Sequence, residues 1–311
     1  MRLGIDIGGT KTAALVLDGS GEVVAHVSAP SGRGNTQVLA TAVDVAERAA
    51  SVVGGWTAVD HVGACMPGLV DPATGWARHA VNLAVQALDL AGGLEAATGR
   101  RPVVDNDVKA AALGAHHALR PAVPGGTTAY LNVGTGLAAA IVHRDEVVRG
   151  AGGAAGEIGH IPVGTGVTCS CGQEGCLETI ASGTALHRLW PRPAGDLFPA
   201  ASAGDERAVQ VVATLAHGIA LAVQLLVVTG AEVVVVGGGL ARDRAELEAA
   251  LAADITERSA RSPFLRRLDL LSRIRVLDGD VPVAAIGAAL LGGSETAGAQ
   301  PVGTVLGWRS S

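Results

Sequence analysis

Residues Gly150–Glu178 read GAGGAAGEIGHIPVGTGVTCSCGQEGCLE, and they combine a glycine-rich run, carboxylates, a histidine and three clustered cysteines. Cys169, Cys171 and Cys176 follow a C-x-C-x4-C spacing, and His160 lies nine positions before the first of them. Three thiolates and one imidazole are four soft or borderline ligands, the number that a closed tetrahedral zinc site uses. The alternatives are thiols that only pack, or a disulfide between two of them. We therefore predict a structural zinc ion in this stretch.

Two blocks of this stretch, AGEIGH at 155–160 and CSCGQEGCLE at 169–178, resemble the signature of the ROK family of bacterial sugar kinases and sugar-responsive repressors. The resemblance extends over nearly the whole chain. It implies that Glu157, His160 and Glu178 hold the hydroxyl groups of a sugar. Zinc on one ring nitrogen of His160 would fix the tautomer of the ring, so that the other nitrogen can bind sugar. The alternative for the two glutamates is a solvated surface role.

The composition restricts the kind of core and the kind of partner. A chain of 311 residues can hold one large or two medium domains. Hydrophobic residues make up 49% of it, yet it has only two Phe, one Tyr and four Trp, so we expect a core of small aliphatic side chains. The formal net charge is −6, and no cluster of Lys and Arg is present. Nucleic acid is therefore not an expected partner.

The N-terminal sequence, the cysteine content and the distribution of apolar residues predict a cytoplasmic protein with no membrane span. The N-terminal sequence MRLGIDIGG lacks the features of a signal peptide, and the four cysteines fit a reducing compartment. The most apolar run, Gly218–Gly239, is divided by Gln224, Thr229 and Glu232. We expect a helix followed by a short buried strand there.

The N-terminal pattern predicts three strands joined by tight turns. Strands are expected at Leu3–Ile7, Ala13–Leu17 and Glu22–Val27, followed by a helix over Thr36–Val53 with Asn35 or Thr36 as its cap. LNVGTG at 131–136 then repeats IDIGGT at 5–10. A duplicated unit suggests two lobes that face each other across a cleft.

The family resemblance agrees with this interpretation. It implies an α/β fold with two related lobes, the actin-like, ribonuclease H-like ATPase architecture. We expect a small lobe at 1–115, completed by a C-terminal helix at about 283–311, and a large lobe at 116–282 that contains the zinc motif.

Both glycine loops have the composition of a phosphate cradle, in which backbone N–H groups approach the oxygens and threonine adds a hydroxyl. Each loop alone is also typical of an ordinary hairpin turn. Neither fits the P-loop or Rossmann pattern. Asp6 would lie beside the phosphates, where Mg²⁺ makes a carboxylate tolerable. The predicted loop residues are Gly8, Gly9, Thr10 and Lys11 in the first loop and Gly134, Thr135 and Gly136 in the second. The second loop continues with Ala138–Ala140 where the family has glycines, which leaves its affinity for the phosphate donor open.

A third polar cluster follows the apolar residues Val103 and Val104. Asp105, Asn106 and Asp107 stand at the junction with an alanine-rich helix, where α/β sheets usually place ligands. Capping of the helix is the alternative, and we assign it to Asp105. The resemblance implies that Asp107 is the general base and that Asn106 contacts the sugar.

Further site residues come from the resemblance alone. It implies that Asn82 reaches the sugar and that the backbone at Gly68 lies close to it. The triplet Gly237, Gly238 and Gly239 follows a predicted strand of four valines. It would let adenine and ribose lie against the backbone, and a tight strand-to-helix turn is compatible with the same residues.

The resemblance, together with these residues, implies an ATP-dependent hexokinase that uses Mg²⁺ and phosphorylates the 6-hydroxyl group of glucose or a related hexose. The alternatives are a sugar-binding regulator of the same family, or a kinase for N-acetylmannosamine, N-acetylglucosamine, mannose, allose or fructose. Polyphosphate is an alternative donor. The resemblance implies a homodimer or a homotetramer.

Overall fold

The computed structural model describes residues 1–119, 126–241, 244–278 and 281–293. These residues form two compact units. Of the described residues, the first contains 1–119, 145–147 and 282–293, and the second contains all of the others. The lobe limits expected from the sequence stay predictions, and the expected C-terminal part at 294–311 lies outside the described residues.

The sheet of the first unit has the strand order β3-β2-β1-β4-β8. Its first three strands are an antiparallel meander, and its last two run parallel to β1. The strands are β1 (Arg2–Ile7), β2 (Lys11–Leu17), β3 (Val23–Pro30), β4 (His61–Met66) and β8 (Val103–Asn106).

The second sheet has the order β11-β10-β9-β12-β13. As in the first sheet, the central strand β9 pairs antiparallel with the strand that follows it in the chain, β10, and the last two strands, β12 and β13, run parallel to β9. The duplication predicted from the two glycine loops is therefore confirmed, because each loop joins the first two strands of a sheet. The strands are β9 (Thr127–Val133), β10 (Leu137–His143), β11 (Glu146–Val148), β12 (Val233–Gly237) and β13 (Ile274–Val276).

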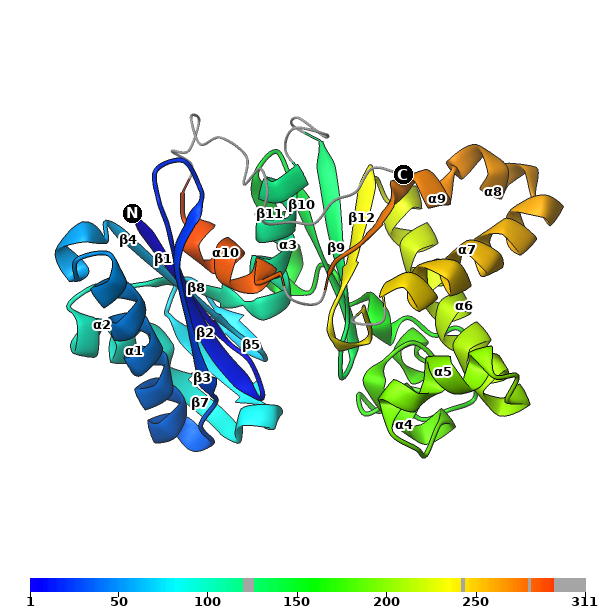
Figure 1. Ribbon diagram of the computed structural model, residues 1–311, viewed down its shortest axis with the longest axis horizontal. Helices are drawn as coiled ribbons and strands as arrows, with labels where there is room; N and C mark the ends of the chain where they lie inside the picture. Colours follow the sequence, from blue (N-terminus) through cyan, green and yellow to red (C-terminus); the bar gives the residue numbers. More distant parts are fainter. Residues whose placement is uncertain (120–125, 242–243, 279–280, 294–311) are drawn as a thin grey trace. The chain divides into compact units, whose positions relative to one another are not determined.

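Helices cover both faces of the first sheet. Figure 1 shows α1 (Gly34–Val52) and α2 (Leu90–Thr98) on one side, and α3 (Asp107–Leu119) and α10 (Val283–Leu290) on the other. A small antiparallel sheet of β5 (Leu69–Asp71), β6 (Trp76–Ala80) and β7 (Val85–Asp89) completes the unit. The core is mostly Ala, Val, Leu and Ile, as the composition predicts.

The start of α1 differs from the prediction. The helix begins at Gly34, and Arg33 precedes it without a side-chain capping bond. Asn35 instead lies in the first turn, where its amide donates to the carbonyl of Ala87 at 2.6 Å. The predicted cap was therefore wrong, because a contact with a distant strand uses the side chain that local capping would have needed.

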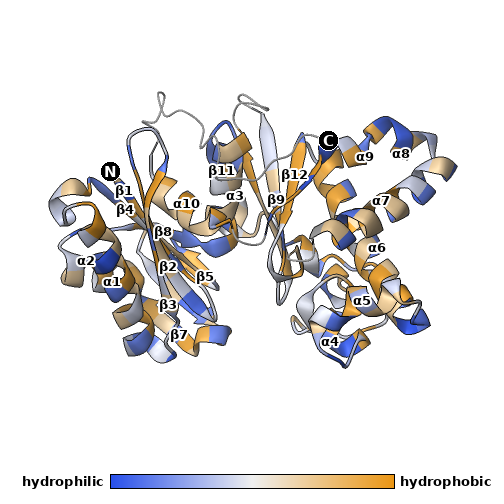
Figure 2. Cartoon of the chain, in the orientation of Figure 1, coloured by the Kyte–Doolittle hydropathy of each residue, from blue (hydrophilic) through white to orange (hydrophobic). Residues whose placement is uncertain are grey.

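Glycines bring α10 unusually close to its neighbours. A methyl group added at Gly4 in β1 would overlap the carbonyl oxygen of Ala285, and one at Gly63 in β4 would overlap that of Ala288. Gly287 makes the same kind of approach to the backbone of α3. Figure 2 shows hydrophobic colouring over most of α10. The helix is thus held by backbone-to-backbone packing that only glycine permits.

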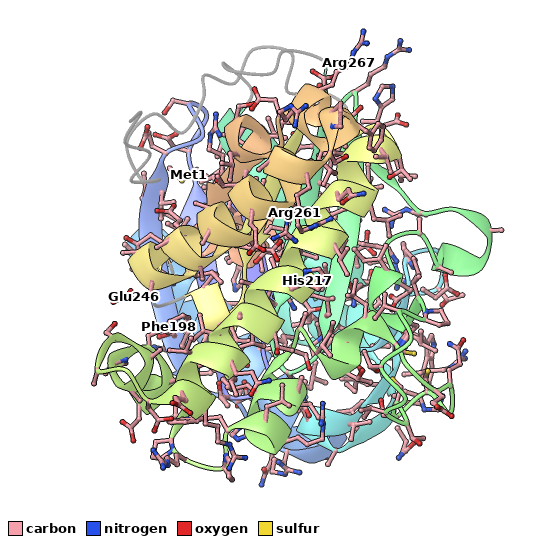
Figure 3. The ribbon with its side chains drawn as sticks, turned by 90° about the vertical axis from the view of Figure 1, so that its right-hand side faces the viewer. Met1, Phe198, His217, Glu246, Arg261 and Arg267 are labelled. Atoms are coloured by element: carbon pink, nitrogen blue, oxygen red, sulfur yellow. The ribbon has the colours of Figure 1, made fainter. Side chains whose placement is uncertain are left out.

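The second unit packs long helices on its sheet. Figure 3 shows α6 (Glu206–Val228) beside α7 (Arg244–Arg261), and His217 on α6 meets Asp254 on α7 with a Nδ1–Oδ1 distance of 2.9 Å. The shorter helices are α4 (Gly183–Leu189), α5 (Leu197–Ser202), α8 (Pro263–Leu268) and α9 (Leu270–Arg273).

Within the described part of the chain, α6 alone is long and apolar enough to cross a membrane by length and composition. Buried helices of globular cores pass the same test. Ala216, Ile219 and Val223 of α6 lie in the core of the second unit.

The packing of α10 leads to a prediction about stability. We expect Gly63→Ala to lower the free energy of unfolding by about 1–3 kcal/mol, because the new methyl group must displace helix backbone. Gly19→Ala is the matched control, since open space surrounds Gly19 and its φ is not positive. Urea unfolding followed by circular dichroism measures both. Equal midpoints for the two variants would contradict the tight packing of α10.

Candidate functional site

The first glycine loop is a hairpin whose carbonyl groups are held by Ser31. Gly8 N–H donates to Lys11 C=O at 3.0 Å and closes the turn between β1 and β2. Ser31 donates its hydroxyl to Gly8 C=O at 2.6 Å and its N–H to Thr10 C=O at 3.0 Å. The N–H groups of Gly9 and Thr10 have no hydrogen-bond partner among the described residues. Such a turn presents donors to an anion while its acceptors are bonded elsewhere.

Asp6 lies at the end of β1, just before this loop. Cys65 on β4 is its partner in the sheet register, and Cys65 Sγ lies 3.7 Å from Asp6 Oδ1. Burial and then the charge of Asp107 raise the pKa of Asp6 to about 7. The two carboxylates therefore interact electrostatically, and a cation near them would favour their ionised forms.

Asn106 joins the start of α3 to Gly68. Its Oδ1 accepts the N–H groups of Val108 at 3.0 Å and Lys109 at 3.3 Å, and its Nδ2 donates to Gly68 C=O at 3.2 Å. Asn106 thus caps the helix, a role that the sequence analysis assigned to Asp105. The buried Asp105 instead accepts the N–H of Asn106 at 2.8 Å, because the strand still continues at that position.

Asp107 and Asn82 lie in the same unit as the first loop. Asp107 is the first residue of α3, and its Oδ1 accepts the N–H of Val108 at 2.9 Å. The amino end of a helix stabilises a carboxylate. Asn82 lies against the loop, since a methyl group on Gly9 would come within 3.2 Å of Asn82 Cβ.

The second glycine loop is a hairpin between β9 and β10. Gly134 C=O accepts the N–H of Gly183 at 2.7 Å, and Thr135 C=O accepts both the N–H and the hydroxyl of Thr184 at 3.1 and 2.9 Å. The N–H groups of Thr135 and Gly136 have no partner in the described part of the chain. As in the first loop, carbonyl oxygens of this loop accept hydrogen bonds from a neighbouring segment, while N–H groups stay available to a ligand.

Ala138–Ala140 follow the loop rather than forming part of it. They lie in β10, and Ala139 N–H donates to Gly156 C=O at 2.8 Å. A methyl group at Gly156 or Gly159 would overlap the backbone of β10. The AGEIGH block therefore packs directly on this strand. The effect of the three alanines on the affinity for a phosphate donor stays a prediction.

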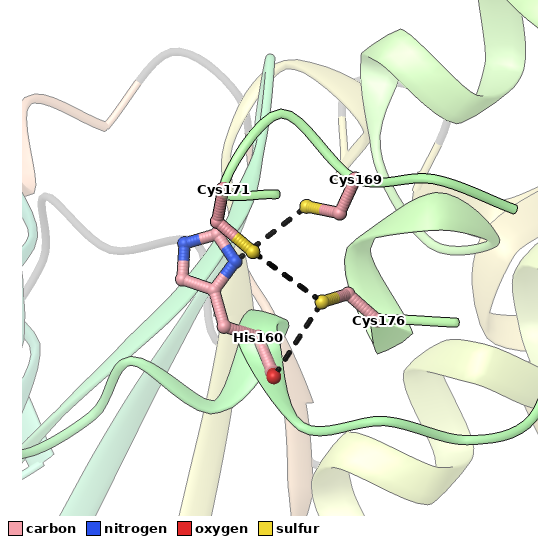
Figure 4. A group of neighbouring side chains, drawn as sticks. All are labelled: His160, Cys169, Cys171 and Cys176. Carbon is pink, nitrogen blue, oxygen red and sulfur yellow. Dashed lines mark hydrogen bonds between the residues drawn. The ribbon is translucent and has the colours of Figure 1, made fainter. Parts of the chain in front are cut away.

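The predicted zinc ligands come together at one point. Cys169 Sγ lies 3.7 Å from His160 Nδ1, and Cys171 Sγ lies 3.7 Å from Cys176 Sγ (Figure 4). All four ligand atoms lie within 4.8 Å of one another. Glycines with positive φ, among them Gly172 and Gly175, turn the chain around the cluster.

The donor set fits zinc. Tetrahedral Zn–S bonds of about 2.3 Å place two sulfurs roughly 3.7–3.8 Å apart, which matches the distance between Cys171 and Cys176. Hydrogen bonding, chiefly from the backbone N–H of Gln173, lowers the pKa of Cys171 to about 6. Burial instead raises the pKa of Cys176. Because a metal ion binds the thiolate form of cysteine, an easily ionised thiol in the cluster favours the binding of a cation.

One predicted sugar contact of the second unit, His160, belongs to this cluster, and the other two, Glu157 and Glu178, lie near it in the chain. His160 and Glu157 belong to one turn, in which His160 N–H donates to Glu157 C=O at 3.2 Å. The ring of His160 turns Nδ1 towards Cys169, so that Nε2 is the nitrogen available for another ligand. Glu178 Oε1 lies 3.6 Å from Cys169 Sγ, while its Oε2 accepts the N–H of Leu137 at 3.0 Å. Glu157 is exposed, and Glu178 is half-buried.

The glycine triplet borders an apolar pocket. Gly237 ends β12, Gly238 has a φ of 99°, and Gly239 begins a short 3₁₀ helix, Gly239–Ala241. The pocket has a volume of about 250 Å³. Its lining is built from small and aliphatic residues and one phenylalanine: Leu186, Ala194, Gly195, Leu197, Phe198, Leu215, Ile219, Gly239, Leu240 and Leu247. Its chemistry suits a flat, largely apolar group such as a nucleobase.

Four residues of these sites were missed in the sequence analysis. Ser31 and Thr184 hold the carbonyl groups of the loops, and Cys65 lies beside Asp6. Asn132 stands at the position in β9 that corresponds to Asp6, and its amide lies close to both Gly134 and Gly238. Only Asn132 could have been found from the sequence, because the match of LNVGTG to IDIGGT aligns it with Asp6. The others depend on contacts between distant segments.

The predicted site residues therefore form one group in each unit. The first glycine loop, Asp6, Gly68, Asn82, Asn106 and Asp107 lie in the first unit, and the remaining residues lie in the second. Their individual roles stay predictions.

Comparison with known proteins gives the family. The sequence model of the ROK family matches residues 2–291. Glucokinase from Halalkalibacterium halodurans is 31% identical in an alignment of 268 positions that covers 77% of this chain and 80% of that protein. N-acetylmannosamine kinase from Yersinia pseudotuberculosis is 30% identical in an alignment of 263 positions that covers 82% of this chain and 88% of that protein.

Solved structures agree with the fold. A ROK hexokinase from Thermus thermophilus has a TM-score of 0.77 and 32% identity, over 93% of this chain and 96% of that one. A ROK family glucokinase from Streptomyces griseus, in complex with glucose and AMPPNP, has a TM-score of 0.71 and 26% identity, over 93% of this chain and 97% of that one. The predicted actin-like α/β fold class is confirmed. A family match over nearly the whole chain and curated sugar kinases at 30% identity or more show that the chain belongs to the ROK family and is a sugar kinase.

Proposed function

We propose that this sugar kinase is an ATP-dependent hexokinase that transfers the γ-phosphoryl group to the 6-hydroxyl group of glucose or a close relative. The observation that carries the proposal is the pair of equivalent hairpins with free N–H donors and bonded carbonyl groups. Each such loop suits the phosphate groups of a nucleotide. The glucokinase at 31% identity and the glucokinase structure with glucose and AMPPNP support glucose and ATP as substrates.

The nucleotide base has a suitable place in the second unit. The apolar pocket beside Gly239 can take adenine by burial of its flat faces, and the turn at Gly237–Gly239 lets ribose approach the backbone. Bound with ATP, Mg²⁺ would neutralise part of the charge of the triphosphate. Asp6 is the carboxylate that we assign to its neighbourhood, because Asp6 lies two residues before the first loop.

Asp107 is the proposed general base. In a loose transition state the attacking oxygen forms little bond before its proton leaves, so that orientation of the hydroxyl group matters most. The bond from Val108 N–H fixes one oxygen of Asp107, and Asn106 is held by Gly68 and by the helix that it caps. We assign to Asp107 the acceptance of the proton and to Asn106 a contact with a neighbouring hydroxyl group.

The carboxylates of Glu157 and Glu178 and the Nε2 atom of His160 are the proposed contacts of the remaining hydroxyl groups. Charge-assisted hydrogen bonds of this kind are stronger than neutral ones. Zinc bound by His160, Cys169, Cys171 and Cys176 would supply a rigid anchor for the imidazole ring. The cysteine segment would then hold His160 and Glu178 in place before sugar arrives.

N-acetylmannosamine is the second candidate substrate, because a kinase for that sugar is 30% identical over 82% of the chain. The two candidates share the proposed residues and differ only in the sugar. The cytoplasmic location and the dimeric or tetrameric state stay predictions.

A screen of ADP release over a panel of hexoses tests the proposed function. We expect the highest kcat/KM with glucose and ATP, and little activity with polyphosphate as donor. N-acetylmannosamine, N-acetylglucosamine, mannose, allose and fructose complete the panel. A kcat/KM for N-acetylmannosamine at least tenfold above that for glucose would replace the first candidate by the second.

Replacement of Asp107 tests the assignment of the base. Asp107→Asn keeps the shape of the side chain but cannot take up a proton, so we expect kcat to fall by about 10²–10⁴-fold. Sugar affinity, measured by calorimetry, should weaken by less than about tenfold, or 1.4 kcal/mol. A kcat within a few-fold of wild type would remove Asp107 from this role.

The cysteine cluster yields a prediction about metal content. We expect one zinc ion per chain by elemental analysis, and its loss in Cys171→Ser. This variant should also lose sugar affinity while keeping its far-UV circular dichroism spectrum, because each unit has a hydrophobic core of its own. Cys65→Ala is the control and should keep its zinc, since Cys65 lies outside the cluster. Wild-type protein without zinc would refute the site.

A further inference from the structure

The segment that follows the cysteine cluster is bonded directly to the second glycine loop. Residues 178–184 make four hydrogen bonds with residues 134–137: Glu178 Oε2 with Leu137 N–H, Gly183 N–H with Gly134 C=O, and Thr184 N–H and hydroxyl with Thr135 C=O. Three of these bonds hold carbonyl oxygens. Glu178 alone holds an N–H group, and it does so with a charged side chain.

The carboxylate of Glu178 lies between the loop and the cluster. A methyl group at Gly136 would overlap Oε2, so the loop backbone passes directly beside the carboxylate. Oε1, the other oxygen, lies 3.6 Å from Cys169 Sγ. Hydrogen bonds to ionised groups are shorter and stronger than those between neutral groups. Glu178 therefore restrains the point at which the loop becomes strand β10.

The cluster in turn restrains the segment that carries Glu178. Cys176 precedes it by two residues, and Thr179 donates its hydroxyl to Cys176 C=O at 2.7 Å. Thr165 and Thr179 share a hydrogen bond of 2.8 Å, and Arg188 donates to Thr179 C=O at 2.7 Å. The side chain of Glu178 thus extends from a short 3₁₀ helix, Leu177–Thr179, that is anchored on both sides.

We propose that Glu178 is a positioning residue for the second glycine loop and that it raises the affinity of the loop for nucleotide phosphates, whether or not sugar is present. The proposal rests on the proposed ATP-dependent function and adds to it, because a contact with sugar alone would not involve the nucleotide. Without Oε2, Leu137 N–H loses its partner, and the N–H groups of Thr135 and Gly136 lose a fixed orientation. Binding must then order the loop, which lowers affinity.

Calorimetric titration of the full-length protein with a non-hydrolysable ATP analogue and Mg²⁺, in the absence of sugar, tests this role. We expect Glu178→Ala to weaken analogue binding about tenfold, in keeping with the loss of one charged hydrogen bond. Glu178→Gln keeps an acceptor oxygen and should bind the analogue within about threefold of wild type. Its sugar KM should still rise, because the charge is lost.

Glu174→Ala is the matched control, since it removes an exposed carboxylate only four residues before Glu178 in the chain. It should bind the analogue as wild type does. Glu178→Asp withdraws the carboxylate by one methylene group and should weaken binding several-fold, which provides a second variant if Glu178→Ala does not fold. Zinc content and circular dichroism of each variant identify the folded proteins.

Wild-type affinity for the analogue in folded Glu178→Ala and Glu178→Asp would overturn the positioning role and leave the proposed function intact. A wild-type protein that binds no analogue would overturn the proposed function and this inference together. The two failures are therefore distinguishable in one set of titrations.

Discussion

A backbone turn can bind an anion only when its carbonyl oxygens are kept away from the anion, because each peptide unit carries an acceptor as well as a donor. Both glycine loops of this kinase meet this constraint in the same way. Ser31 holds the carbonyl groups of Gly8 and Thr10, and the Gly183–Thr184 pair holds those of Gly134 and Thr135. In each unit a neighbouring segment thus prepares the loop before any ligand is present.

Close packing of backbone on backbone is a second feature that recurs in both units. Gly4 and Gly63 let α10 approach β1 and β4, and Gly156 and Gly159 let the AGEIGH block lie on β10. The alanine-rich composition serves the same purpose, because small side chains allow backbones to meet at distances that larger ones forbid. Stability therefore depends on the shape of the backbone in a core with few aromatic rings, and an added methyl group at such positions costs more than its size suggests.

The cysteine cluster and the second loop belong to one continuous piece of structure. The cluster holds His160 and, through Cys176, the short helix with Glu178. Glu178 then holds Leu137 at the end of the loop. In this arrangement the cluster can support both the sugar contacts and the phosphate contacts that we propose for the second unit. Rigid support of this kind reduces the ordering that binding must otherwise impose.

Local patterns in the sequence were enough to predict the strands around both loops, the duplicated order of elements, the gathering of His160 with the three cysteines and the small-residue core. Each of these features follows from the periodicity or spacing of residues within a short stretch of sequence, so that it can be recognised without knowledge of distant contacts. Other features depend on which distant segments meet. The predicted cap of α1 was wrong because the side chain of Asn35 bonds to Ala87 instead. Asn106 rather than Asp105 caps α3, because strand β8 extends one residue further than predicted. The partners of the loop carbonyls, Ser31 and Thr184, and the contact of Cys65 with Asp6 were decided by the tertiary structure alone, because the register between separate segments determines which polar groups come within hydrogen-bond distance.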